Sequence, residues 1–217
     1  KQRHKLRVQQ VRRQKIFLTC LFLLIVGCIL LRFSKFSGRQ KETHQINAAC
    51  EAYRDEVSSE AAQYDMSDYV DLILAVMMQE SSGQGTDPMQ SSEGAYNTRY
   101  PQQPNGITDP SYSISCGIQE LKYALEKAVC TGPTDLSKIR LALQAYNFGA
   151  DSYFAYLEEN GQTVWTAQSA QAFAQMASGG TQRDEDDPLH DPAGPWDYGD
   201  QYYPDHVLRY YHLDNNS

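Results

Sequence analysis

The chain has 217 residues and a formal net charge of −8, and 41% of its residues are hydrophobic. This length allows one domain together with a tail or anchor. Residues 1–41 hold 11 of the 19 Lys and Arg residues and no Asp or Glu, so residues 42–217 carry a formal charge of −19. A domain of that charge repels nucleic acid, which excludes nucleic acid as a partner, whereas the basic N-terminal segment suits an anionic membrane surface.

The N-terminal region has the pattern of a signal anchor. The basic residues 1–15 precede an uncharged run, IFLTCLFLLIVGCILL, and we predict a single transmembrane helix over residues 16–33. The excess of basic residues before this run places the N-terminus in the cytoplasm and the rest of the chain outside the cell. No small-residue cleavage site follows, so the anchor is expected to remain uncleaved, with residues 34–44 as a linker.

Two questions about the cysteines remain open. Ile25 to Cys28 resembles a bacterial lipobox, so lipidation of Cys28 is an alternative to the transmembrane anchor. A disulfide between Cys50 and Cys130 is conceivable outside the cell, and small buried thiols are the alternative.

From residue 45 onward the apolar spacing is helical, and we predict one mainly α-helical domain over residues 45–217. Ser67 is expected to cap the helix that ends at Glu80, and residues 81–110 are rich in Gly, Pro, Ser, Asn and Gln, which is typical of a binding loop. The other predicted helices are Gln45–Gln63, Ser111–Val129, Leu136–Asn147, Ala150–Glu159, Val164–Ser178 and Asp205–Leu213.

Glu80 is a candidate catalytic residue. It ends a helix in which Leu72 to Met78 are all apolar, and a carboxyl group that is buried without a cation has a raised pKa. A carboxylic acid that stays protonated near pH 7 is what a glycosidase needs to protonate its leaving group. The alternative is a surface glutamate beyond the helix end.

Other common sites are absent from the sequence. There is no GxSxG, HExxH, Walker A or GxGxxG motif. His190, His206 and His212 have irregular spacing, and the acidic run Asp184–Asp187 lacks the EF-hand pattern, so we predict no metal site and no cofactor.

Four short motifs occur in a fixed order. They are Glu80-Ser81, Met89-Gln90, the run Ala145 to Gly149 (AYNFG), and the run Pro204 to Tyr211. In this order they resemble the lysozyme-like superfamily of goose-type lysozymes and soluble lytic transglycosylases. The loop from Gln79 to Glu93 is most similar to the muramidase domain of bifunctional cell-wall hydrolases of Gram-positive conjugative elements.

The resemblance implies roles for individual residues. It assigns the catalytic acid to Glu80, and it places Gln90 and Ser91 on the sugar-binding side of the loop. It also places Tyr146 and Asn147 beside the glutamate, and Ser81, the second residue of the Glu-Ser motif, joins this substrate-binding set. The amides of Gln90 and Asn147 can bond to acetamido and hydroxyl groups, and Tyr146 offers a ring face and a hydroxyl.

The second carboxylate stays open at this stage. An inverting glycosidase needs a base about 6.5–9.5 Å from the acid to place water. Glu93, Asp87 and Asp109 are the candidates from the loop, and Glu93 is preferred. Lytic transglycosylases use one glutamate, and the sequence does not separate the two outcomes.

The expected function is a membrane-anchored muramidase that cuts the β-1,4 bond between MurNAc and GlcNAc outside the cell. By resemblance, it would open the wall for conjugation or a type IV secretion channel, with peptidoglycan, the membrane and channel proteins as partners. The alternatives are a lytic transglycosylase and a non-catalytic wall-binding subunit. Close relatives usually continue into a cysteine endopeptidase domain, so this chain is expected to be either a stand-alone or a truncated muramidase.

Overall fold

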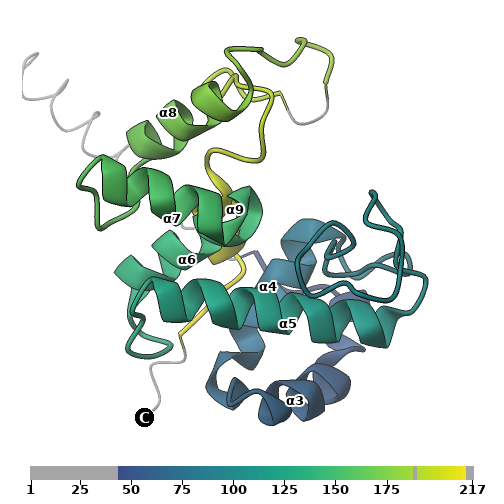
Figure 1. Cartoon of the computed structure of the whole chain (residues 1–217). Helices are drawn as coiled ribbons and strands as arrows, with labels where there is room; N and C mark the ends of the chain where they lie inside the picture. The colour runs from purple at the N-terminus through teal and green to yellow at the C-terminus, as the bar shows by residue number, and fades with distance from the viewer. Residues whose placement is uncertain (1–43, 188–189, 214–217) are drawn as a thin grey trace, which may run out of the picture. The chain divides into compact units, whose positions relative to one another are not determined.

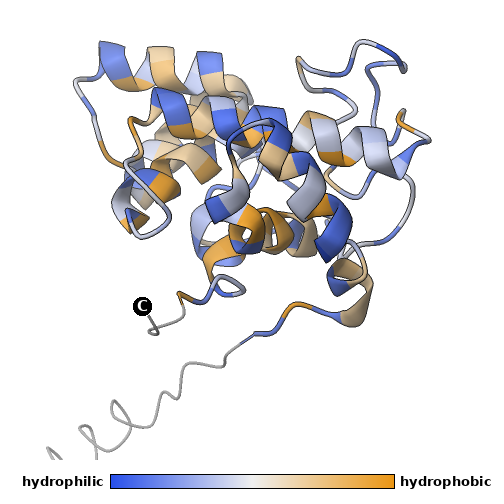
Figure 2. Ribbon diagram, turned by 90° about the horizontal axis from the view of Figure 1, so that it is seen from below, coloured by the Kyte–Doolittle hydropathy of each residue, from blue (hydrophilic) through white to orange (hydrophobic). Residues whose placement is uncertain are grey.

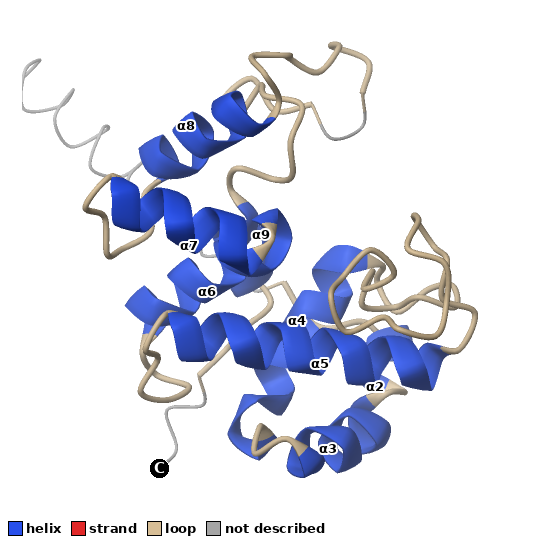
Figure 3. Ribbon diagram, viewed as in Figure 1, coloured by secondary structure: helices blue, strands red, loops and turns tan. Residues whose placement is uncertain are grey.

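The computed structural model describes residues 44–187 and 190–213, and this part of the chain is mainly helical (Figures 1 and 3). No β-strand occurs within these residues, apart from an isolated bridge between Gln182 and Trp196. The elements in order are α2 (Ala48–Glu51), α3 (Arg54–Gln63), the 3-10 helix η1 (Ser67–Tyr69), α4 (Val70–Glu80), α5 (Pro110–Lys127), α6 (Leu136–Phe148), α7 (Ala150–Glu159), α8 (Ala167–Ala177) and α9 (Tyr203–Leu208).

Helix α4 is the core element. Its six consecutive residues Leu72 to Met77 are completely buried, and α2, α3 and α9 pack against it. Full burial of a Leu, Ile or Met side chain contributes about 1.5–3 kcal/mol, so this one helix supplies a large share of the hydrophobic stabilisation. Because α4 is surrounded on several sides, the residue at its end is held in a fixed place.

Helices α5 and α6 pack on each other, and α6 also contacts α7 and α9. Pro110 stands in the first turn of α5, where its missing N–H costs no hydrogen bond. Asp135 caps α6 by accepting a hydrogen bond from the Lys138 N–H at 3.3 Å. In Figure 2 many helices carry both hydrophilic and hydrophobic residues, as expected for helices with one face on a core.

An aromatic cluster joins α6, α7, α8 and the loop segment before α9. Phe148 at the end of α6 lies 5.3 Å from the ring of Tyr153 on α7, 5.1 Å from Phe173 on α8 and 5.6 Å from Tyr198. Pairs at these centroid separations add about 0.5–1.5 kcal/mol each beyond the area that they bury. The cluster therefore fixes the end of α6 and the segment before α9 against each other.

The structure differs from several predicted helix boundaries, and the last helix spans Tyr203–Leu208 rather than the predicted Asp205–Leu213. The predicted helix Gln45–Gln63 is divided into α2 and α3, because the Tyr53 N–H bonds three residues back to Cys50 O at 3.0 Å and tightens the turn. Ser67 does not cap α4, since it lies in η1 and Tyr69 is the residue before the helix. Helix α8 begins at Ala167 rather than Val164, because Thr166 and Ser169 form a capping box.

Cys50, Cys116 and Cys130 are free thiols in this structure, so the conceivable Cys50–Cys130 disulfide is not formed. Cys50 contacts the Met78 sulfur at 3.8 Å, whereas Cys130 lies near the Tyr69 hydroxyl at 3.7 Å.

The predicted anchor over residues 16–33 lies outside the described residues. Among those that are described, none of the helices combines the length and apolar character needed to cross a membrane.

Gly117 on α5 provides a stability test. A Cβ at this position would lie 2.6 Å from the Met89 Cβ, whose side chain is fully buried. Gly117→Ala should therefore lower the free energy of unfolding by about 1–3 kcal/mol, although alanine in a helix is normally favoured by about 1 kcal/mol. Chemical denaturation of the full chain measures this effect. Gly132→Ala is the matched control, because nothing lies within 4 Å of its Cβ, and equal effects of both changes would contradict the packing argument.

Candidate active site

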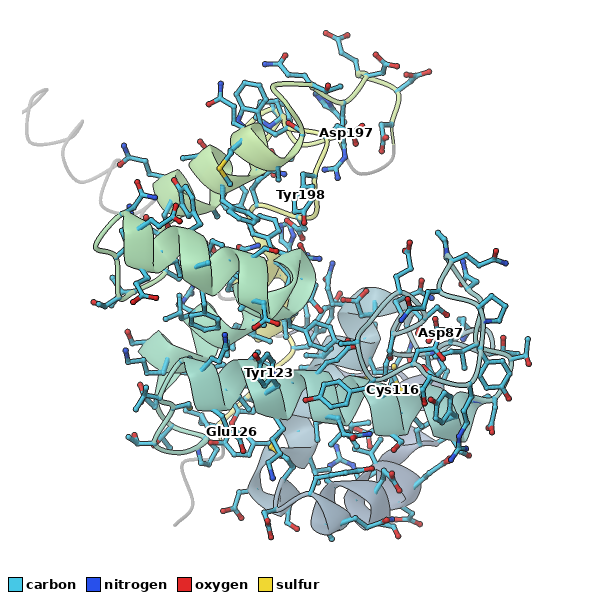
Figure 4. All side chains as sticks on the ribbon, in the orientation of Figure 1. Asp87, Cys116, Tyr123, Glu126, Asp197 and Tyr198 are labelled. Carbon is cyan, nitrogen blue, oxygen red and sulfur yellow. The ribbon has the colours of Figure 1, made fainter. Side chains whose placement is uncertain are left out.

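Glu80 lies at the end of α4 and lines a cavity of about 630 Å³. The walls come from the loop before α5, from α5 itself, from the junction of α6 and α7, and from the segment before α9. Figure 4 labels Tyr123 on α5 and Tyr198 before α9, which belong to two of these walls. The lining residues are Glu80, Gln90, Glu93, Gly94, Ala95, Tyr96, Glu120, Tyr123, Ala145, Tyr146, Asn147, Phe148, Gly149, Ala150, Asp151, Ser152, Tyr198 and Gly199.

The pKa of Glu80 is raised to about 7, and burial in the apolar end of the domain is the main cause. A hydrogen bond donated by the Tyr203 hydroxyl to Glu80 Oε1 opposes this shift, whereas the charges of Asp200 and Asp87 add to it. No Lys or Arg lines the cavity within the described part of the chain. Without a cation nearby, a substantial fraction of Glu80 is a protonated acid at neutral pH.

Two tyrosines flank Glu80. The rings of Tyr146 and Tyr203 are stacked, with centroids 6.3 Å apart and planes at 20°. The Tyr146 hydroxyl donates to Met89 O at 2.9 Å, which joins α6 to the loop, and Tyr203 is only 2% exposed. Tyr146 lines the cavity together with Glu80, and its hydroxyl is already bonded to the loop backbone, so its ring is the part that can contact a ligand.

Asn147 also lines the cavity, and its amide has a structural partner. Its Oδ1 accepts a hydrogen bond from the Asp200 N–H at 2.7 Å. Gly199 has a φ of +48°, and a Cβ there would lie 2.6 Å from the same oxygen. The amide nitrogen of Asn147 has no hydrogen bond to any described residue, so it is the group that can donate to a ligand.

Asp87 organises the loop between α4 and α5. This carboxylate is 2% exposed, and it accepts hydrogen bonds from the N–H groups of Ser91 and Ser92 at 3.0 and 3.1 Å. The Ser113 hydroxyl donates to it at 2.6 Å, and the Ser92 hydroxyl donates as well. With every acceptor position used, Asp87 is a structural carboxylate rather than a base that could hold water.

The structure separates the other predicted loop residues into two groups. Gln90 and Glu93 are exposed side chains on the cavity wall, whereas Ser91 is 1% exposed and donates to Ser113 O at 3.0 Å, inside the loop. Ser81 does not line the cavity, because its hydroxyl donates to Pro88 O at 2.8 Å and ties the helix end to the loop. Asp109 lies at the start of α5 and lines a different cavity.

Glu120 is a cavity residue that the sequence analysis missed. Burial raises its pKa to about 7, and the charges of Asp87 and Glu80 add to that shift against a backbone hydrogen bond from Tyr96. Its Oε1 atom is buried without a hydrogen-bond partner, and a Cβ on Gly94 would overlap that atom. Glu120 is thus packed beneath the loop segment from Gly94 to Tyr96 and supports this wall of the cavity.

Three residues at or near the cavity, Tyr203, Glu120 and Asp200, were not predicted from the sequence. Only Tyr203 could have been found there. Tyr203 directly precedes Pro204 and stands where the family motif of the last helix carries a tyrosine, so the resemblance pointed to it. Glu120 and Asp200 had no such signal, because they are single acidic residues in a polar helix face and a loop.

Comparisons with known proteins identify a family and several relatives. A family model described as lysozyme-like matches residues 48–211. The bifunctional muramidase/DL-endopeptidase CwlT of Bacillus subtilis is 35% identical over 169 residues, which cover 78% of this chain and 44% of that protein. The uncharacterized membrane protein YocA of Bacillus subtilis is 40% identical over 115 residues, covering 51% of this chain and 45% of the relative.

A solved structure is also similar. It is the crystal structure of a lipoprotein-like protein of the NLP/P60 family from Staphylococcus aureus, with a TM-score of 0.66 and 27% identity, covering 80% of this chain and 56% of that one. The chain thus spans about half the length of the curated relatives that it matches.

The Asp87 network should be necessary for the loop. Asp87→Asn replaces an acceptor of four hydrogen bonds with an amide that faces donors, and we expect a loss of about 2–4 kcal/mol in unfolding free energy. Amide hydrogen exchange should accelerate first in the loop between α4 and α5. Asp109→Asn is the control, since its side chain makes no capping bond. Unchanged loop protection in Asp87→Asn would disprove the role.

Burial of Glu80 should also appear in the pH dependence of stability. Its pKa in the folded chain is about 7 against 4.5 when unperturbed, so the folded state binds the proton more tightly and stability falls as pH rises from 4.5 to 7. Glu80→Gln should therefore be more stable than the wild type by about 1–3 kcal/mol at pH 8 and similar to it at pH 4. Denaturant titrations at both pH values measure the difference, and an equal effect at the two values would refute the burial penalty.

Proposed function

The chain belongs to the lysozyme-like family, and on this basis we propose that it is a peptidoglycan hydrolase, specifically a muramidase that cleaves the β-1,4 bond between MurNAc and GlcNAc. The observation that carries the proposal is Glu80, a carboxyl group with a pKa of about 7 in a cavity of a size that suits sugar units. The name of the similar CwlT supports the same substrate.

In this proposal Glu80 is the general acid. It gives its proton to the glycosidic oxygen as the bond to the sugar C1 breaks, and the electron pair of that bond stays on the leaving oxygen. The hydrogen bond from Tyr203 orients the carboxyl group and stabilises the carboxylate that remains. Tyr146 offers a ring face to the sugar, and Asn147 offers its amide nitrogen. Gln90 offers its Oε1 as an acceptor, because its Nε2 already donates to Asp87 O at 2.9 Å and to Asn105 Oδ1 at 3.1 Å.

Hydrolysis also needs a base for the attacking water, and we assign this role to Glu93. Its side chain is exposed on the cavity wall, where water is available. Glu120 is less suited, because its Oε1 is buried beneath Gly94. Asp87 is excluded by its four hydrogen bonds, and Asp109 by its position outside the cavity.

A lytic transglycosylase is the second candidate, and one observation favours it. Glu93 makes no hydrogen bond within the described residues that would hold it at a fixed distance from Glu80. A transglycosylase needs no separate base. The same glutamate gives its proton to the leaving oxygen, and the resulting carboxylate then takes the proton of the substrate's own hydroxyl as that oxygen bonds to C1 and closes the anhydro ring.

The proposal extends to where the enzyme acts. The basic residues 1–15 and the following segment 16–33, which is uncharged up to Leu31, support a membrane anchor with the domain on the outer side. Local opening of the wall for conjugation or a type IV secretion channel is the purpose that the resemblance supports. Channel proteins would then be partners in addition to the glycan strands.

Glu80→Gln tests the proposal directly. The variant keeps the shape of the side chain but cannot donate a proton, so release of fragments from purified peptidoglycan by the full chain should fall by about 10²–10⁴-fold. Glu159→Gln is the matched control, because that glutamate is exposed at the end of α7 and does not line the cavity. Fragments are analysed by mass spectrometry. Reducing muramic acid ends support the muramidase, and anhydro ends the transglycosylase. Glycan binding without turnover by the wild type would instead favour a non-catalytic wall-binding subunit.

The variants Glu93→Gln and Glu120→Gln show which of these two carboxylates acts as the base for the attacking water. Glu93→Gln should lower hydrolysis by about 10²-fold or more without lowering the unfolding free energy, since the side chain is exposed. Glu120→Gln should retain most activity and gain stability above pH 7, where the buried carboxylate is unfavourable. If Glu120→Gln lost activity and Glu93→Gln kept it, the role of the base would be assigned to Glu120 instead.

A further inference from the structure

A second cavity of about 600 Å³ lies on the other side of the segment Ala95–Tyr96, and these two residues line both cavities. Its other walls come from the second half of α3, the first half of α5 and the loop before α5. The lining residues are Glu60, Tyr64, Ala95, Tyr96, Thr98, Arg99, Asp109, Ser111, Tyr112, Ser115 and Gln119. The proposed glycosidase chemistry uses none of those that belong to this cavity alone.

Arg99 is the one cation of this cavity within the described residues. Its guanidinium lies over the ring of Tyr112, 4.5 Å from the centroid, and makes no ion pair or hydrogen bond to any described residue. Tyr112 is itself fixed, because its hydroxyl donates to Tyr96 O at 3.1 Å and accepts from the Thr98 N–H at 3.0 Å. The ring therefore holds the guanidinium in place with its hydrogen-bond donors free, which is the geometry that suits a carboxylate.

The ring of Tyr112 is not an open platform for a sugar. Arg99 covers one face of the Tyr112 ring, and Tyr100 approaches the same ring with centroids 5.5 Å apart. The Tyr64 hydroxyl is engaged with the Ser115 hydroxyl at 3.0 Å. Stacking of a neutral sugar needs an open ring face, whereas this cavity presents charge.

The second cavity is lined by both acidic and basic side chains. Glu60 and Asp109 line the cavity together with Arg99, so an acidic group and an amino group can both find a partner there. The peptide stem of peptidoglycan has this chemistry, because it is a short peptide with carboxylates and an amine. It is attached to the lactyl group of muramic acid, and so it lies next to a muramic acid that is bound beside Glu80.

We propose that the second cavity binds the peptide stem of the glycan strand whose muramic acid occupies the Glu80 cavity, with Arg99 as the carboxylate-binding residue. This inference rests on the proposed function. The wall Ala95–Tyr96 separates the sugar from the peptide, and it is kept in place by Glu120 below it and by Asn97, whose Nδ2 donates to Ser92 O at 2.6 Å and to Tyr100 O at 3.1 Å. The enzyme then prefers peptide-bearing strands to bare glycan.

The test compares two substrates with the purified full chain. Peptidoglycan with its stems is compared with the same material after an amidase has removed them, and both are followed by the release of soluble fragments. The wild type should have a kcat/KM at least about 10-fold higher on the peptide-bearing strands. Arg99→Gln should lose this preference through a higher KM, while its turnover of stripped strands stays equal to that of the wild type. Lys138→Gln, which removes a partly exposed cation outside both cavities, is the control and should keep the preference.

A binding measurement separates this inference from the proposed function. Isothermal titration of Glu80→Gln with a free acidic stem tetrapeptide should show binding that is lost in Glu80→Gln combined with Arg99→Gln, with unchanged thermal unfolding. If the wild type cuts neither substrate but the tetrapeptide still binds through Arg99, the proposed function fails and the peptide site stands. Equal rates on both substrates together with no tetrapeptide binding would overturn the peptide site and leave the glycosidase proposal intact.

Discussion

Burial of one carboxyl group at the end of an apolar helix is the constraint on which this site depends. The helix α4 cannot move Glu80 into solvent, because its six residues Leu72 to Met77 are enclosed by other helices. The C-terminal end of a helix carries partial negative charge, which further disfavours an ionised carboxylate. Tyr203 provides the compensating hydrogen bond. The fold thus sets the protonation of Glu80 through packing rather than through a neighbouring cation.

A second carboxylate in the same region illustrates the opposite arrangement. Asp87 is as deeply buried as the core, yet four donors satisfy it, and it organises the loop between α4 and α5. Glu80 has one strong donor and lies on a cavity. The two acids differ in the number of their hydrogen bonds and in exposure, because Asp87 is closed off inside the loop whereas Glu80 is only partly buried and lines the cavity. This difference separates a structural role from a chemical one within a few residues of sequence.

The sequence alone predicts those helices whose ends are set by capping residues and glycines. Helices α6 and α7 were predicted nearly to the residue, because Asp135 is a capping residue and Gly149 separates the two helices. Glu80 at a helix end was also predicted. The mainly helical, lysozyme-like fold is confirmed by the structure and by the family match over residues 48–211.

What depends on contacts between distant segments could not be predicted. The roles of Ser91 and Glu120 are set by packing of the loop on α5, which no periodicity encodes. The break between α2 and α3 arises from a tightened turn at Tyr53 inside a good helical pattern. These positions follow from tertiary structure, which overrides local propensity.

The bond between Tyr203 and Glu80 joins residues 123 positions apart, and this separation has a consequence for biogenesis. A chain that is synthesised from its N-terminus completes α4 long before α9 exists, and domains fold as units once their last segment is available. Until then the glutamate lacks both its hydroxyl donor and the helix that covers it. In a nascent chain that lacks α9, Glu80 therefore has neither its hydrogen bond from Tyr203 nor the full burial that raises its pKa. Formation of the site therefore awaits the synthesis and docking of α9.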